Sequence, residues 1–193
     1  MDDRYLLVGL GNPGREYQKN RHNVGFQVLD YLANRHGLAY SRKRNDAFIA
    51  TGSVVGRQVI LAKPQTYMNR SGRSVSGLMR FYKIPAERLL VVVDDLDLPV
   101  GSLRLRGSGG SAGQKGMKDI IAHLGSEDFA RLRVGIDRPP GRMDPADYVL
   151  QDFSKDQRAV IDETYSRAAD AIETWLRDGI ELAMSRHNGP APE

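Results

Sequence analysis

Apolar residues along this chain form short continuous runs that alternate with stripes of helical spacing. A short apolar run bounded by turn residues is typical of a strand buried on both faces of a sheet. Such runs occupy residues 5–8 and 89–93, and residues 131–136 predict a further strand. Leucine and arginine alternate over residues 103–106, which predicts a strand with one basic face, and residues 46–63 have the composition of a β-hairpin.

Other segments place their apolar residues three and four positions apart, which predicts amphipathic helices. The first covers roughly residues 24–36 and ends at Gly37, in the position expected of a C-terminal cap. The last begins at Ser154, whose spacing from Gln157 is that of a capping box. Two further helices have the apolar positions Val75, Leu78, Met79 and Tyr82, and Met117, Ile120, Ile121 and Leu124.

Strands that alternate with helices predict an α/β protein with a twisted mixed sheet, mostly parallel, flanked by helices and carrying an antiparallel hairpin portion. The length of 193 residues suits one domain with a substantial core. We expect a single domain over residues 1–187 and a frayed tail over residues 188–193, which contain two prolines.

Composition narrows the classes of protein. No apolar run approaches the roughly 18 to 20 residues of a membrane span, and the start of the chain lacks the basic and apolar segments of a signal peptide. We therefore expect a cytoplasmic protein. The chain has no cysteine, which excludes a thiol nucleophile, a disulfide framework and a cysteine-based zinc site.

The net charge is only +4, but the basic residues are clustered. The clusters are Arg42-Lys43-Arg44, Arg104-x-Arg106 and Arg131-x-Arg133. A one-sided basic surface suits a polyanionic ligand, because neutralising phosphates releases counterions and supplies much of the affinity. For any single cluster, an ordinary solvated surface remains an equally open interpretation.

Candidate catalytic groups follow the two apolar strands. His22 is the one histidine of four in a polar segment just after a strand and its turn, and histidine is the natural general base near neutral pH. If the strands are neighbours, Asp94 can accept the other ring N–H and orient the imidazole. Asn12 and Asn69, near turns, could then polarise a carbonyl or hold an oxyanion. These residues favour hydrolysis by water of an ester or amide on a polyanion.

Three other interpretations use nearby residues. The spacing Gly9-x-Gly11-x-x-Gly14 matches a dinucleotide fingerprint, but no helical pattern follows at once. Ser111 lies in a G-x-S-x-G pattern of serine esterases, but the preceding strand alternates with arginine instead of being apolar. Asp94, Asp95 and Asp97 suggest a divalent metal, but extended chain sends neighbouring side chains to opposite faces. We expect neither metal nor cofactor.

Several motifs, in order along the chain, resemble the bacterial-type peptidyl-tRNA hydrolases. They are Gly11-Asn12-Pro13-Gly14, Tyr17, Arg21-His22-Asn23-x-Gly25 with Asp30, Met68-Asn69-x-Ser71-Gly72, Asp94-x-Leu96-Asp97-Leu98-Pro99-x-Gly101 and Arg131-Leu132-Arg133-x-Gly135-Ile136. The resemblance implies metal-independent cleavage of the ester between a peptide and the 3′ ribose of tRNA by a monomeric enzyme.

The same resemblance implies roles for the candidate residues. His22 would activate water and Asp94 would orient it, Asn12 would position the ester, and Asn69 would hold the water or the developing oxyanion. The resemblance also implies three sets of contacts to the substrate. Tyr17 would lie near the terminal adenosine, and Asn23 and Tyr67 would line the cleft for the peptide and the acceptor end. Arg106 and Arg133 would bind the tRNA 5′ phosphate.

The chain departs from the family pattern at two places. Gln114-Lys115-Gly116 stands where the family usually has His-Asn-Gly, and Asn20 stands where a threonine is usual. Gln114 and Lys115 are expected to contact substrate, Gln114 as a hydrogen-bond donor and Lys115 as a point charge on a phosphate. An RNA-binding relative without catalysis remains the alternative, although the catalytic candidates are all retained.

Overall fold

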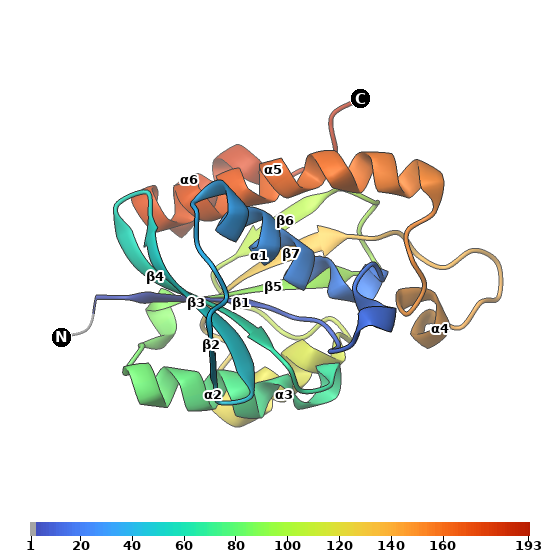
Figure 1. Ribbon diagram of the computed structural model, residues 1–193. Coiled ribbons are helices and arrows are strands. Elements are labelled where there is room, and N and C mark those ends of the chain that lie inside the picture. The colour runs from blue at the N-terminus through green and yellow to red at the C-terminus, as the bar shows by residue number, and fades with distance from the viewer. Residues whose placement is uncertain (1–2) are drawn as a thin grey trace.

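A computed structural model describes residues 3–193, so the first two residues of the predicted domain lie outside the described part (Figure 1). Seven strands form one sheet in the order β2-β3-β4-β1-β5-β7-β6. Their bounds are β1 (Tyr5–Gly9), β2 (Arg42–Arg44), β3 (Ala47–Val54), β4 (Arg57–Pro64), β5 (Leu89–Asp95), β6 (Leu103–Arg106) and β7 (Ala130–Gly135).

The sheet is mixed, as the sequence predicts. The four central strands, β4, β1, β5 and β7, are mutually parallel, whereas β3 and β6 pair antiparallel at the two sides. The predicted hairpin is β3 and β4. The edge strand β2 was not predicted, because its three residues are basic and exposed and carry no apolar signal.

Helices cover both faces of the sheet, and Figure 1 shows α5 above it and α2 below. The helices are α1 (Val24–Arg35), α2 (Ser71–Tyr82), α3 (Lys115–Leu124), α4 (Pro145–Val149), α5 (Lys155–Asp178) and α6 (Ile180–His187). Alternate residues of the central strands therefore face two separate apolar layers. Leu7 packs on the side of α1 and α5, and Leu6 on the side of α2 and α3.

The predicted helix ends have the expected local chemistry. Gly37 has a φ of 66°, and the N–H of Leu38 reaches back to the carbonyl of Ala33 at 2.8 Å. Ser154 and Gln157 form both hydrogen bonds of a capping box at the start of α5.

In the C-terminal tail, Asn188 and Gly189 hydrogen-bond to the backbone of β6.

Close packing, rather than a dinucleotide, accounts for two glycines of the Gly9-x-Gly11-x-x-Gly14 pattern. A Cβ on Gly9 would meet the carbonyl oxygen of Gly25 at the start of α1, and one on Gly25 would meet the carbonyl oxygen of Val92 in β5. A Cβ on Gly11 would lie 2.7 Å from the ring of Phe26. The glycines let α1 begin directly on top of the sheet.

The parallel pairing of β1 with β5 brings the candidate catalytic residues to the carboxyl edge of the sheet. Gly9 at the end of β1 lies opposite Val92, so β5 extends three residues further, to Asp95, and carries Asp94 beside the loop that holds Asn12 and His22. This edge is where ligands of parallel sheets bind.

Candidate active site

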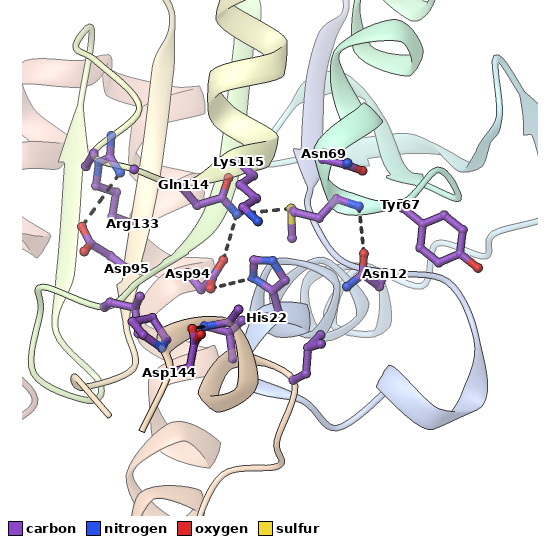
Figure 2. Close-up of a pocket in the computed structure, with 18 residues that line it drawn as sticks. Asn12, His22, Tyr67, Asn69, Asp94, Asp95, Gln114, Lys115, Arg133 and Asp144 are labelled. Atoms are coloured by element: carbon purple, nitrogen blue, oxygen red, sulfur yellow. Dashed lines mark hydrogen bonds and ion pairs between the residues drawn. The ribbon is translucent and has the colours of Figure 1, made fainter. Parts of the chain in front are cut away.

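A cleft of about 500 Å³ opens at the carboxyl edge of β1 and β5 (Figure 2). Its volume is in the range of small-ligand sites. Its lining comes from five separate segments and from Arg133 of β7. The segments are Asn12 and His22 after β1, Tyr67 to Asn69 before α2, Asp94 to Leu96, Ala112 to Lys115, and the residues Asp144 to Ala146, Val149 and Leu150 around α4.

His22 and Asp94 form a hydrogen-bonded pair in this cleft. The Nδ1 atom of His22 lies 2.8 Å from Oδ2 of Asp94, and the side chains are 13% and 3% exposed. A carboxylate can only accept, so Nδ1 carries the proton and donates it. Nε2 remains as the ring nitrogen available to act as a base, as the orienting role predicted for Asp94 requires.

Burial and charge act in opposite directions on His22. Burial lowers the pKa of the imidazole, and the positive charge of Lys115 lowers it further. The charge of Asp94 and its hydrogen bond favour the imidazolium, and these outweigh the opposing effects, so the pKa of His22 is raised.

The segment that carries His22 is fixed by polar contacts, which explains its lack of an apolar stripe. The guanidinium of Arg21 donates to the carbonyl oxygen of Tyr148 at 3.0 Å and to Oε1 of Gln157 at 2.8 Å, and it stacks 3.8 Å from the Tyr148 ring centroid. The amide of Asn20 donates to the carbonyl oxygen of Leu150 at 2.6 Å. Residues 20–23 are thereby tied to α4 and the start of α5.

Asn12 and Asn23 bind each other reciprocally. The N–H of Asn12 donates to Oδ1 of Asn23, and Nδ2 of Asn23 donates to the carbonyl oxygen of Asn12, both at 2.9 Å. Oδ1 of Asn12 accepts the N–H of Met68 at 2.8 Å, which leaves its NH₂ group turned to the cleft as a donor. Asn23 is 2% exposed and lies beneath the cleft lining, not in it.

Tyr67 and Asn69 both line the cleft, and they come directly before and after the buried Met68 in the sequence. Tyr67 is 60% exposed, so its ring is open to a ligand. Figure 2 places Asn69 across the cleft from Asp144, with His22 between them and Asn12 on the side of Tyr67. Tyr17, half-buried in the short turn before His22, is not part of the lining.

Arg131 and Arg133 project from β7 toward the glycine-rich loop of residues 107–113 and bind its backbone. Arg131 donates to the carbonyl oxygen of Gly109 at 2.6 Å, and Arg133 donates to that of Gly110 at 2.6 Å. Burial lowers the pKa of Arg131 to about 10, which leaves it charged at neutral pH. Arg133 also lies 3.9 Å from Asp95 and lines the cleft. Arg106 lies on the neighbouring strand, exposed and outside the lining.

Two parts of the site escaped the sequence-based prediction. Asp144 to Ala146, Val149 and Leu150 line the cleft. A recognisable signal was present: Asp144 before Pro145 is a helix start, and Oδ1 of Asp144 caps the N–H of Ala146 at 2.8 Å. Arg131 was recognised only within a basic cluster and a family motif, and no sequence signal distinguishes an arginine that anchors a loop from one on the surface.

No helix in residues 3–193 has both the length and the apolar character to cross a membrane. Over the same residues, no group of three or more histidine, aspartate or glutamate side chains is arranged to hold a metal ion.

The fold is an α/β fold, and its cleft holds a histidine–carboxylate pair and the amides of Asn12, Asn69 and Gln114 at the carboxyl edge of the sheet. Residues 6–193 match the family model described as peptidyl-tRNA hydrolase. The chain therefore belongs to the peptidyl-tRNA hydrolase family, as its motifs predict.

Relatives and solved structures agree with this assignment. The peptidyl-tRNA hydrolase of Roseiflexus castenholzii is 54% identical over 190 residues, which cover 98% of this chain and 89% of that protein. That of Chloroflexus aurantiacus is 51% identical over 185 residues, 95% and 98% of the two chains. The crystal structure of peptidyl-tRNA hydrolase from Acinetobacter baumannii superposes with a TM-score of 0.93 at 34% identity, covering 100% of this chain and 98% of that one.

Proposed function

We propose that this chain hydrolyses the ester bond of peptidyl-tRNA, the reaction for which its family is named, with His22 as the general base. The observation that carries the mechanism is the 2.8 Å bond between His22 and Asp94 in an open cleft, because it fixes the tautomer that a base requires.

In the proposed step, Nε2 of His22 removes a proton from water, and the hydroxide attacks the ester carbonyl carbon. Asp94 stabilises the imidazolium that forms. The tetrahedral intermediate then collapses, the bond to the 3′ oxygen of the ribose breaks, and that oxygen takes the proton from the imidazolium. The products are free tRNA and a peptide with a carboxyl group.

Asn12 and Asn69 would act on the ester itself. The free NH₂ group of Asn12 is the donor that would position the ester, since its oxygen is already bonded to Met68. Asn69 lines the same cleft and would hold the water or the oxyanion. A pre-oriented amide donor at a developing oxyanion contributes roughly 10²- to 10³-fold in rate.

The tRNA would lie over the basic side of the cleft. Lys115 and Arg133 line the cleft and Arg106 lies on the strand next to Arg133, which supports phosphate binding there. Exposed Tyr67 suits contact with the peptide or acceptor end. We also propose that Tyr17 lies near the terminal adenosine of the bound tRNA. Asn23 would act near the acceptor end through its hydrogen bond to Asn12.

The first experiment measures release of free tRNA from an N-acetylated aminoacyl-tRNA in the presence of EDTA, comparing the wild type with His22→Ala. We expect EDTA-resistant cleavage by the wild type, loss of turnover in the variant, and retained tRNA binding. The unacylated aminoacyl-tRNA is the substrate control. Near-normal turnover by His22→Ala would reject the mechanism, and wild-type binding without cleavage would favour the non-catalytic RNA-binding alternative.

The serine esterase alternative has less support. Oγ of Ser111 accepts the N–H of Gly113 at 3.4 Å, and no histidine is bonded to it in the described chain.

We further propose that the enzyme is a monomeric cytoplasmic protein with one catalytic domain over residues 1–187. A role in translation supports the location, and light scattering of the purified chain tests the monomer.

A further inference from the structure

Gln114 occupies the N-cap of α3, at the point where the glycine-rich loop becomes a helix. Its backbone is extended, with φ −76° and ψ 120°, and its Oε1 accepts the N–H of Met117 at 2.7 Å. An N-cap bond of this kind satisfies one of the free N–H groups at the start of a helix. The residue is only 9% exposed.

The other end of the same amide reaches the catalytic pair. Nε2 of Gln114 lies 3.1 Å from Oδ1 of Asp94 and 3.2 Å from the sulfur of Met68 (Figure 2). The orientation of the amide is fixed by its partners, because only its oxygen can accept the Met117 N–H and only its nitrogen can donate to a carboxylate.

Asp94 is thereby held from two sides. Its Oδ2 binds His22 and its Oδ1 binds Gln114, and the residue is 3% exposed. Two donors on the two oxygens fix the plane of the carboxylate, which in turn fixes the plane of the imidazole. A buried carboxylate that loses one donor carries an unsatisfied oxygen and is free to rotate about its Cβ–Cγ bond.

We infer that Gln114 is a positioning residue for the hydrolysis: it links the α3 helix cap to Asp94 and so holds His22 in line with the substrate, rather than binding tRNA. This inference rests on the proposed function, since it assigns Gln114 to the same His22–Asp94 pair. It also differs from the substrate contact expected of Gln114 from sequence, because both polar atoms of the side chain are already bonded inside the protein.

The nature of the side chain suits this task. Glutamine offers one donor and one acceptor at fixed ends and does not titrate, so Asp94 meets the same N–H at every pH at which the protein is folded. Its length spans from the Met117 N–H to the Asp94 oxygen. A side chain shorter by one methylene can still cap the helix but cannot also reach Asp94.

The test uses Gln114→Asn and Gln114→Glu in the full-length enzyme with N-acetylated aminoacyl-tRNA. Asparagine keeps the cap and loses the bond to Asp94; we expect kcat to fall about 10- to 100-fold with KM within about twofold. Glutamate also keeps the cap but places a second carboxylate against Asp94, so its kcat should fall further.

Ser154→Ala is the matched control, because it removes the N-cap of α5 outside the cleft. It should lower the Tm and leave kcat unchanged. If Gln114→Asn behaves like this control, the residue is only a helix cap and the inference is wrong. If instead KM rises at constant kcat, Gln114 is a substrate ligand, and the inference is equally wrong. A wild type without hydrolysis would refute the proposed function itself, an outcome that the variants cannot mimic.

Discussion

The two walls of the cleft are built on different principles. On the wall of His22, Asp94 and Asn12, each side chain is held by a partner, and Nε2 of His22 and Nδ2 of Asn12 are left without one. On the wall of Arg133, the charged groups of Arg133 and of Arg131, which is buried outside the lining, bind the carbonyls of the glycine-rich loop. The first wall carries the proposed catalytic groups, and the arginines of the second bind a segment of backbone. A basic side chain can therefore bind the substrate or stabilise the fold, and only its hydrogen-bond partners distinguish the two roles.

The largest effect should come from breaking the first wall. In Asp94→Asn, an amide favours the wrong tautomer of His22 and removes the charge that stabilises the imidazolium, so kcat should fall by roughly 10³- to 10⁴-fold. Asp94 raises the pKa of His22, so its loss lowers that pKa. Because the base acts in its neutral form, the acid limb of the kcat profile should move to lower pH. Single-turnover rates across pH measure both effects, and a kcat within tenfold of the wild type contradicts the assigned role.

An intermediate effect should separate two basic residues, Arg133 on the second wall and Arg106 outside the cleft lining. Arg106→Ala and Arg133→Ala should each raise KM by about tenfold, more than they lower kcat, and reduce the slope of log binding against log salt by about one. Only Arg133→Ala should also lower the Tm, because, of these two arginines, only Arg133 donates to the carbonyl oxygen of Gly110. Filter binding at several salt concentrations and thermal unfolding test this, and an unchanged salt slope in both variants would refute the phosphate clamp.

The smallest effect should come from substitution of Lys115, which lines the cleft. Its charge lowers the pKa of His22, so Lys115→Ala should raise that pKa and move the acid limb of kcat to higher pH, with little change in the plateau. Lys118→Ala, on the same helix but outside the cleft lining, is the control. An acid limb that does not move in Lys115→Ala would show that this lysine acts on tRNA alone.

The sequence predicted the elements that bury apolar surface, because periodicity records burial directly. It therefore found β1, β5 and the long helices, and it placed His22 and Asp94 at strand ends that proved to be neighbours. It missed β2 and α4, which are three and five residues long and have little apolar pattern. It also could not separate Arg131 from the other basic residues. The burial of Arg131 depends on its hydrogen bonds to the carbonyl oxygens of Gly109 and Gly110, which are about twenty residues away in the sequence.

The contact between Gly9, Gly25 and Val92 has a consequence for which changes the protein can tolerate. Gly25 carries no reactive group, yet it lies three residues from His22, and any side chain there would push α1 away from β5. The histidine would move with the helix while Asp94 stayed on the sheet. The positions of His22 and Asp94 relative to each other thus depend on the absence of a side chain at Gly25. A single added methyl group there can be as damaging as the loss of a reacting one.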